Sequence, residues 1–238
     1  MADKDDSATT DDAKATDATT APAAVSSTRR QWLLFVVVML LSLGADQATK
    51  IWARAELPLK SGHLEHTCVI PDDIVTGLCR GENVSVVDSF WHWRLSMNPG
   101  SAFGLFASNQ EMARIFLSIV GIVAVGGMLW MLRKSRPDQR ILHWALALVA
   151  GGAIGNLIDR IYYGYVTDFV LWHVGDLDQR TQRYQHEWPV FNVADIVLVI
   201  GVGLMFIDIQ KEGKREKLKG RARDDSARRA GLVKNLRD

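Results

Sequence analysis

The stretch WLLFVVVMLLSLGADQATK, residues 32–50, is almost wholly apolar up to Ala45 and then becomes polar. A helix that crosses a bilayer needs about 20 mostly apolar residues, and this run has that length when it continues to Ala53. A soluble surface helix would instead repeat apolar residues every three to four positions. We therefore expect a transmembrane helix over about residues 32–53, with Asp46 and Lys50 towards its end.

A cleaved signal peptide is the main alternative for this first run, because Arg29 and Arg30 precede it. However, the polar extension in front of the two arginines is long, and DQATK does not resemble a small-residue cleavage site. We therefore expect the run to persist as a membrane helix.

Three further runs, at about residues 112–132, 141–162 and 190–209, have the length and apolar character of spanning helices. A soluble all-α core is the alternative, but it would not contain four such runs with Gly and Ala inside them. The expected fold class is an all-α membrane protein with four transmembrane helices.

The net charge of +1 and the mean hydropathy near zero suit a soluble protein, but the charges are segregated. Residues 1–30 contain hardly any large apolar side chains, and residues 211–238 are mostly charged, so neither end can bury enough apolar surface to offset chain ordering, and we expect both to be disordered or loosely helical. We expect a disordered cytoplasmic extension over 1–30, a four-helix membrane domain over 31–210 with a polar outward insertion at about 56–83, and a basic cytoplasmic tail over 211–238.

Basic residues in short flanks favour the cytoplasmic side of a membrane. They precede the first run, lie between the second and third runs (133–140) and follow the fourth. Both termini are therefore expected in the cytoplasm, with the loops at about 54–111 and 163–189 facing outwards. The basic tail would lie against anionic lipid, and nucleic-acid binding is the weaker alternative.

Two features stand out in the first outward loop. Residues 85–97, SVVDSFWHWRLSM, are rich in β-forming and aromatic residues, so we expect a short strand pair at the membrane interface with Trp91 and Trp93 in the aromatic belt. Cys68 and Cys79 fit either one disulfide or two free thiols.

The same loop has His63 and His66 close to Cys68, but their loose spacing favours a surface loop over a metal site.

The aspartates of the membrane domain are expected at one depth. Asp46 lies roughly 21 Å along the first helix from Trp32, and Asp159, Asp168 and Asp195 fall near the outward ends of the third and fourth runs. Carboxylates at such positions are candidates for a functional site. Asp208 falls at the opposite end, where an interfacial cap is the simpler expectation.

Two of these aspartates have charged neighbours in the sequence. Asp46 has Lys50 four residues later, and Asp159 stands beside Arg160 and near Asn156. An i,i+4 pair or a buried polar network would satisfy them. Supporting or substrate-positioning roles are therefore expected for both.

Asp168 and Asp195 have no base within a helical turn of sequence. Two carboxylates brought together in a poorly solvated site would not both ionise, and one would keep its proton. That arrangement can activate a water with one carboxylate and polarise a carbonyl with the other. From charge alone, a catalytic dyad and two separate sites on an ion path are both open.

Glycine-rich stretches mark places of close approach or turns. GGAIG, residues 151–155, gives the third run a small-residue face on which another helix can pack tightly. NPGSAFG, residues 98–104, reads as a turn before the second run.

Taken together, the blocks DQATK, NPGSAFG, GGAIGNLIDR, GYVTDF and WPVFNVAD occur in this order along the chain. Over about residues 31–210 the sequence thereby resembles lipoprotein signal peptidase, also called signal peptidase II, of bacteria. The resemblance implies a four-helix membrane bundle with a small outward-facing β-cradle, located in the bacterial cytoplasmic (inner) membrane with its active site near the outer face.

In that family the aspartates of the V-x-D-F and F-N-x-A-D blocks form the catalytic dyad of an intramembrane aspartic endopeptidase, here Asp168 and Asp195. The resemblance implies prolipoprotein substrates that carry a diacylglyceryl cysteine, with cleavage just before that cysteine. The remaining motif residues are implied to bind substrate or support the site: Asp46, Lys50, Asn98, Gly100, Asn156, Asp159, Arg160 and Asn192.

No metal or cofactor is expected, because two carboxylates and a water suffice; the partners expected are the prolipoprotein and membrane lipids, and a monomer is the expected state. Pro99 departs from the family pattern, which often has a small polar residue there, and stiffens the turn.

A transporter is the main rival function, but a transporter should place ionisable groups at several depths. A scaffold that binds precursors without cutting them is the second rival, and the presence of both aspartates speaks against it.

Overall fold

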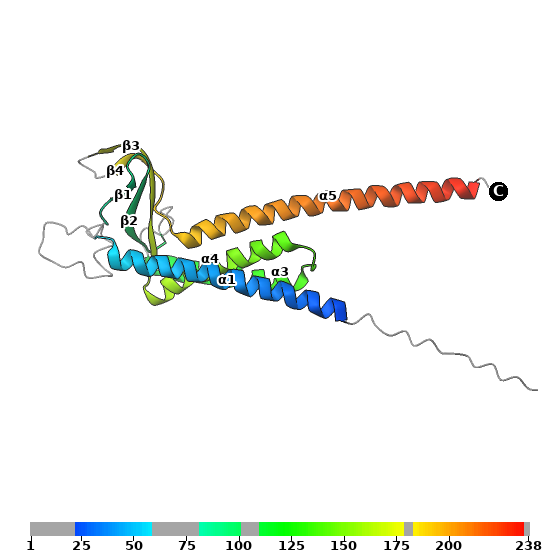
Figure 1. Ribbon diagram of the computed structural model, residues 1–238, viewed down its shortest axis with the longest axis horizontal. Helices are drawn as coiled ribbons and strands as arrows, with labels where there is room; N and C mark the ends of the chain where they lie inside the picture. Colours follow the sequence, from blue (N-terminus) through cyan, green and yellow to red (C-terminus); the bar gives the residue numbers. More distant parts are fainter. Residues whose placement is uncertain (1–21, 59–80, 101–109, 179–182, 236–238) are drawn as a thin grey trace, which may run out of the picture.

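The computed structural model describes residues 22–58, 81–100, 110–178 and 183–235, which form a helical bundle with one small sheet at its end (Figure 1). The bundle helices of this part of the chain are α1 (Pro22–Glu56), α3 (Gln110–Lys134), α4 (Arg140–Tyr162) and α5 (Val193–Asn235). All four are long and apolar enough to cross a membrane. The expected four spanning helices are confirmed, each within a few residues at its outward end.

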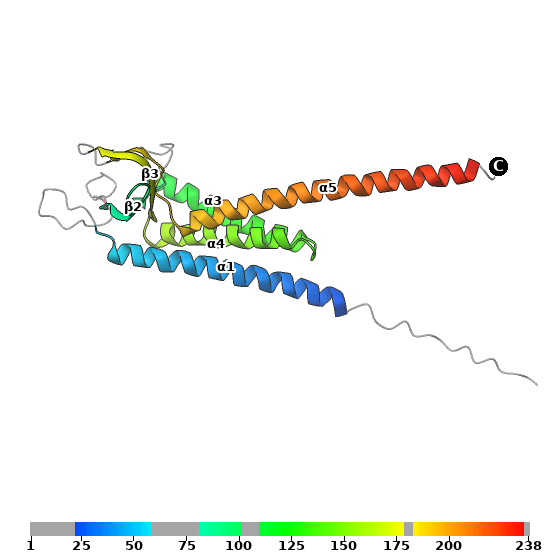
Figure 2. The ribbon, with the colours of Figure 1, turned by 45° about the horizontal axis from the view of Figure 1, so that its top comes forward.

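Helix α4 is the centre of the bundle and contacts α1, α3 and α5; Figure 2 shows it between α1 and α5. Its glycines allow this closeness. A Cβ atom added to Gly151 would lie 2.0 Å from Oγ of Ser42, and one added to Gly155 would lie 2.3 Å from Oδ2 of Asp46. The small-residue face therefore packs as predicted, and two of its glycines cannot be replaced without moving α1.

From Gln31 onwards, one face of α1 is buried at positions three or four residues apart, as the helical repeat requires. The buried residues are Gln31, Phe35, Val38, Ser42, Asp46, Lys50 and Ala53, followed by Leu57 just after the helix. Phe35 and Val38 belong to a core shared with α3 and α4, and Ala53 and Leu57 to a second core under the sheet. Ser42, Asp46 and Lys50 thus lie buried between two apolar cores.

The sheet has four antiparallel strands in the order β1-β2-β3-β4. They are β1 (Val84–Val87), β2 (Trp91–Asn98), β3 (Val166–Asp178) and β4 (Arg183–Glu187). The predicted strand pair over 85–97 is present as β1 and β2. β3 pairs with β2 so that Ser96 lies opposite Asp168, which brings the end of β2 to the first residues of β3.

Trp91 and Trp93, which were expected in an aromatic belt, are partly buried. Trp93 packs edge-on against Trp52, with ring centroids 5.4 Å apart. Trp91 and Trp93 both pack on the core under the sheet, which contains Leu95 and Met97 of the same strand. In the sheet region, Trp172 and Trp188 are the more exposed tryptophans, at 49% and 66%.

The two terminal helices extend beyond the expected spans. Helix α1 begins at Pro22, inside the segment 1–30, and α5 continues through the basic tail to Asn235. Arg136 pairs with Glu212, and Arg215 lies 2.6 Å from Asp138, so the start of the tail is tied to the α3–α4 turn. His63, His66, Cys68 and Cys79 lie outside the described residues.

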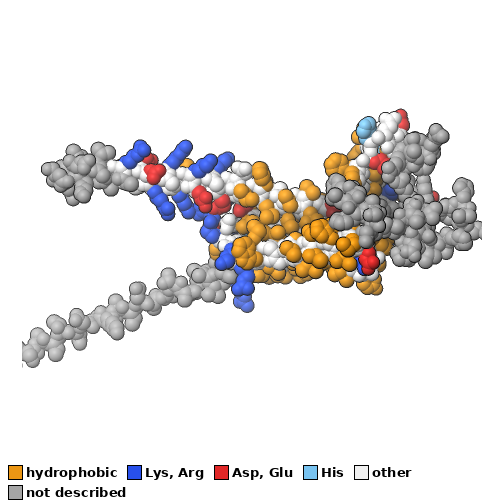
Figure 3. All heavy atoms as spheres, turned by 180° about the vertical axis from the view of Figure 1, so that it is seen from behind, with side chains coloured by type: hydrophobic (Ala, Val, Ile, Leu, Met, Phe, Trp, Pro, Cys, Tyr) orange, Lys and Arg blue, Asp and Glu red, His pale blue; other side chains and the backbone are white. Residues whose placement is uncertain are grey.

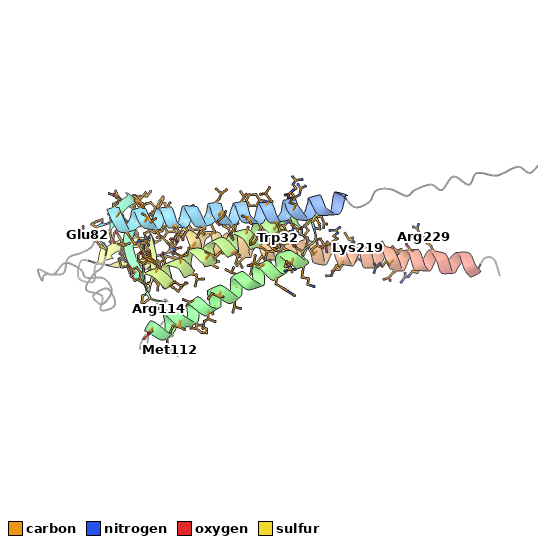
Figure 4. The ribbon with its side chains drawn as sticks, turned by 90° about the horizontal axis from the view of Figure 1, so that it is seen from below. Trp32, Glu82, Met112, Arg114, Lys219 and Arg229 are labelled. Carbon is orange, nitrogen blue, oxygen red and sulfur yellow. The ribbon has the colours of Figure 1, made fainter. Side chains whose placement is uncertain are left out.

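The charged and apolar surfaces are separated along the bundle. In Figure 3 hydrophobic side chains cover the helices, and Lys and Arg gather at the end away from the sheet. Figure 4 shows Glu82 near one end of the bundle, while Lys219 and Arg229 lie on the part of α5 that projects beyond the other end.

Candidate active site

The first turn of α5 holds one of the two candidate carboxylates. Helix α5 begins at Val193, so Asn192 is its N-cap and Asp195 its third residue. The Asp195 backbone N–H donates to Oδ1 of Asn192 over 3.0 Å, and the Asn192 backbone N–H donates to Oδ2 of Asp195 over 3.2 Å. This reciprocal pair is a capping box. It fixes Asp195 to the start of the helix.

The second carboxylate, Asp168, lies near the start of β3 and is buried. Asn192 donates from Nδ2 to its Oδ1 over 2.7 Å, and Asn98 donates from Nδ2 to its Oδ2 over 3.0 Å. Asn98 is itself oriented by the Gly100 backbone N–H, which donates to its Oδ1 over 2.9 Å. Gly100 has φ of 107°, a conformation that favours glycine, so the turn in NPGS aims the Asn98 amide at Asp168.

Asn156 of α4 joins the two carboxylates to a buried lysine. Lys50 donates from Nζ to Oδ1 of Asn156 over 2.8 Å. Because an ammonium group can only donate, the oxygen of this amide faces Lys50 and its nitrogen faces away. Nδ2 of Asn156 donates to Oδ1 of Asp195 over 2.9 Å, and its Oδ1 also accepts from Nδ2 of Asn192 over 3.1 Å. One connected network therefore runs from Asp168 through Asn192 and Asn156 to Asp195.

Asp46 and Asp159 lie behind this network, both fully buried. Lys50 pairs with Asp46 over 2.9 Å and lies 3.4 Å from Asp159. Asp46 also accepts from the backbone N–H of Ala194 over 2.9 Å, which satisfies a second free N–H at the start of α5. Asp46 thus has the expected ion pair with Lys50, and it also reaches beyond its own helix.

The partners of Asp159 differ from the expected ones. Its carboxylate accepts from the backbone N–H of Thr167 over 2.8 Å and lies 3.6 Å from Nη1 of Arg54. Arg160 instead donates to the backbone oxygen of Asn156 over 3.3 Å, and its charge also acts on both Asp168 and Asp195. The reason is helical geometry, because adjacent residues of a helix point to different sides.

Asp208 lies apart from this site. Gln139, just before α4, donates to its carboxylate over 3.2 Å. The expected role as a cap near the other end of the bundle is consistent with this contact.

Burial, and after it the nearby charge of Asp195, raise the pKa of Asp168 to about 7, against the hydrogen bonds from Asn98 and Asn192, which lower it. A carboxyl group with a pKa of about 7 carries a proton in a substantial fraction of molecules at neutral pH, so Asp168 can donate one.

All ten sequence-predicted residues lie in or next to this network. The sequence argument missed three contributors, Arg54, Thr167 and Gln47. Arg54 stands eight residues after Asp46, two helical turns along the same face, so the spacing could have indicated it. Thr167 had no such signal, since its contact depends on how β3 passes α1. Among the described residues, no three His, Cys, Asp or Glu side chains form a group that could hold a metal ion.

Residues 38–211 match the sequence profile of the family described as signal peptidase (SPase) II. The chain belongs to the signal peptidase II family. The family expected from the five sequence blocks is thereby confirmed, and the protein is a peptidase with several membrane-spanning helices.

Individual members of the signal peptidase II family resemble most of the chain. A lipoprotein signal peptidase of Xanthomonas campestris pv. campestris (strain 8004) is 34% identical over 192 residues, covering 79% of this chain and 93% of that protein. One from Syntrophotalea carbinolica is 39% identical over 142 residues, covering 60% and 82%. A bacterial membrane enzyme solved by the in meso method at 1.9 Å resolution has a TM-score of 0.51 and 25% identity, covering 76% of this chain and 92% of that chain.

Proposed function

We propose that this member of the signal peptidase II family is an intramembrane aspartic endopeptidase with Asp168 and Asp195 as its dyad. Its substrates are prolipoproteins that carry a diacylglyceryl cysteine, and the bond cut is the one just before that cysteine. The observation that carries the proposal is the bridge through Asn192, which binds Oδ1 of Asp168 and Oδ2 of Asp195. Two carboxylates held by one residue have the closeness that shared proton chemistry needs.

The two carboxyl groups have different roles in the reaction. Asp195 is ionised and takes a proton from the attacking water, while protonated Asp168 donates its proton to the oxygen of the scissile carbonyl. A bond forms between the water oxygen and the carbonyl carbon. When the tetrahedral species breaks down, Asp195 gives its proton to the leaving nitrogen and Asp168 recovers the hydroxyl proton as the carbonyl re-forms.

The surroundings of the dyad favour this division of roles. Asp168 is 2% exposed, whereas Asp195 is partly buried and begins a helix. The free N–H groups and dipole of a helix N-terminus stabilise a negative charge. Amide groups of Asn156 and Asn192 satisfy Asp195 without neutralising it, so it can remain ionised and accept a proton.

The position of the dyad suits a substrate anchored in the membrane. Asp195 is in the first turn of a spanning helix and Asp168 follows shortly after α4, where the sheet begins. A signal peptide that spans the bilayer ends at that level, and the diacylglyceryl chains of the next residue can remain in lipid.

The chain is placed in the bacterial cytoplasmic membrane with both termini in the cytoplasm and the sheet on the outer side. The support is the distribution of bases, because Arg133 and Lys134 end α3, Arg140 begins α4, and the projecting part of α5 is rich in Lys and Arg.

The direct test uses the full chain purified in detergent and a prolipoprotein modified with diacylglycerol on its cysteine. The wild type is expected to release the signal peptide at the bond before that cysteine, identified by mass spectrometry. Asp168→Asn and Asp195→Asn should each fold and lose at least 1,000-fold in kcat, on the order of the loss when a general acid or base is removed. Asp176→Asn, which changes an exposed aspartate of the same strand β3, should retain the wild-type rate.

Near wild-type cleavage by either dyad variant would remove that aspartate from the mechanism. A folded wild type that binds the precursor without cutting it would overturn the proposal in favour of a binding protein.

A further inference from the structure

We infer that Arg54 is a positioning residue for Asp168, acting by holding the turn between α4 and β3 from both sides. This inference rests on the proposed function, because it concerns the geometry of the same dyad. It assigns a role to a residue that lies outside the five sequence blocks.

Arg54 contacts three groups around this turn. Its Nη1 donates to Oγ1 of Thr167 over 2.7 Å and lies 3.6 Å from Oδ1 of Asp159. Its Cζ lies 4.3 Å from the centroid of the Tyr163 ring. Asp159 and Tyr163 precede the turn and Thr167 follows it, so a single guanidinium joins the two sides.

The turn itself is short and tightly bonded. The Tyr163 backbone N–H donates to the Asp159 backbone oxygen over 2.8 Å, and Gly164 then reverses the chain with φ of 83°. Thr167 enters β3 fully buried, and its backbone N–H donates to Oδ2 of Asp159 over 2.8 Å. Asp159 therefore holds Thr167 by its backbone, and Arg54 holds it by its side chain.

Asp168 is the next residue, so the position of its carboxyl group depends on how firmly Thr167 is held. The partners of Asp168 itself come from other elements, Asn98 at the end of β2 and Asn192 before α5. These amides fix the orientation of the carboxyl group, but the backbone that carries it is anchored to α1 through Arg54. A residue of α1 therefore influences the position of a dyad carboxyl group that it does not touch.

A lysine could not replace all these contacts. The planar guanidinium can donate in one plane while its face lies over an aromatic ring, which an ammonium group cannot do. The two oxygens of Asp159 have different cations beside them, because Lys50 lies near Oδ2 and Arg54 lies near Oδ1. Without Arg54, Oδ1 of this buried carboxylate loses its nearest positive charge among the described residues.

Loss of Arg54 should lower the rate of the chemical step more than the affinity for substrate. The contacts of Arg54 are to Thr167, Asp159 and Tyr163 of the protein itself, so its loss is expected to disturb the geometry of the dyad. A displacement of a catalytic group by about 1 Å can cost on the order of 100-fold in rate. We expect Arg54→Ala to lower kcat about 30- to 100-fold with KM changed less than about twofold.

The experiment measures kcat and KM for Arg54→Ala, Arg54→Lys and Thr167→Val, each alone, and for Arg54→Ala combined with Thr167→Val. Arg54→Lys should recover part of the kcat lost in the alanine variant, because it keeps the charge near Asp159. Thr167→Val should lower kcat alone, and should add little when Arg54 is already absent. Arg136→Ala, which removes an exposed arginine at the α3–α4 turn, is the control and should leave both constants unchanged.

The inference is tested under the condition that wild type cleaves the substrate and Asp168→Asn does not. It would then be overturned by an unchanged kcat in Arg54→Ala, by a change in that variant confined to KM, or by no recovery of kcat in Arg54→Lys. If Arg54→Ala does not fold, Thr167→Val decides, and wild-type kcat in that variant would overturn the inference. Absence of cleavage by folded wild type would remove the proposed function and this inference with it.

Discussion

Asn192, the N-cap of α5, donates from its side-chain Nδ2 to Oδ1 of Asp168 over 2.7 Å. The same residue accepts from the Asp195 backbone N–H. A single amide therefore sets the relation between a strand and a helix that each carry one carboxyl group.

The first prediction separates these two tasks of Asn192. Serine is a good N-cap, but it is too short to reach Asp168. Asn192→Ser should therefore keep the cap, lower Tm through the loss of the buried Nδ2 bonds to Asp168 and Asn156, and lower kcat about 10- to 100-fold, the equivalent of one lost hydrogen bond to a charged or strongly polarised group. Steady-state cleavage and thermal unfolding in detergent check it. If activity decreases only in proportion to the fraction of unfolded protein, the cap of α5, and not the bond to Asp168, accounts for the loss.

The second prediction concerns pH. If Asp168 acts as the acid, the active form holds its proton, and its pKa of about 7 places the loss of that form near neutrality. The value of kcat/KM should therefore fall as pH rises through about 7, approaching a tenfold decrease for each further pH unit. A profile over pH 5 to 9, with Tm followed in parallel, tests this. Activity that increases through pH 7 at constant Tm would make Asp168 the base.

The third prediction compares two glycines in spanning helices. A Cβ on Gly155 would lie 2.3 Å from Oδ2 of Asp46, whereas one on Gly126 of α3 would meet nothing within 4 Å. Gly155→Ala should destabilise the protein by about 1–3 kcal/mol or more and lower activity, because α1 carries Lys50 into the site. Gly126→Ala should be neutral or stabilising by up to about 1 kcal/mol. Thermal unfolding of both variants provides the comparison, and a stable, active Gly155→Ala would contradict the close approach of α1 and α4.

The fourth prediction concerns a pair of buried histidines in the sheet. Nε2 of His173 lies 2.7 Å from Nδ1 of His92, and the Tyr184 hydroxyl lies 3.1 Å from Nε2 of His92. Burial lowers the pKa of both histidines, with the charge of Arg94 acting in the same direction and Asp88 and Glu187 opposing it. The folded protein thus binds fewer protons than the unfolded chain in this range, so stability should fall as pH decreases below about 6.5.

The His173 ring stacks on the Tyr184 ring with centroids 3.5 Å apart. His173→Phe tests the pH dependence, because phenylalanine can keep this stacking and cannot titrate. Between pH 7.5 and 5.5 the wild type should lose more Tm than this variant. Equal losses would show that the histidine pair does not set the acid sensitivity of the sheet.

The helices and the main polar contacts were predictable from the sequence, because they depend on local spacing. Long apolar runs gave the spanning helices, and the separation of Asp46 and Lys50 gave an ion pair on one helical face. The glycines of GGAIG likewise indicated a face of α4 on which another helix packs closely, without indicating which helix. Each of these signals lies within one element, where the helical repeat fixes which residues are neighbours.

The contacts between elements were not predictable in the same way. Residues 163–189 contained no alternation that indicated β3 or β4, because β3 is buried on both sides near Asp168 and reads as an apolar run. The bonds of Asn98 and Asn192 to Asp168 depend on the register of β2 with β3 and on the start of α5. The sequence blocks identified these residues through a family resemblance, and only the fold supplies their partners.

The pairing of Asp46 with Lys50 within α1 also bears on how the chain enters the bilayer. The two side chains are 2.9 Å apart on one helix, so the aspartate has its counter-ion as soon as that helix forms. Helix α1 precedes α4 and α5 in the chain, so it is synthesised before Asn156, Asp159 and the N-terminus of α5 exist to bind it. Its insertion can therefore precede the assembly of the network that it later completes.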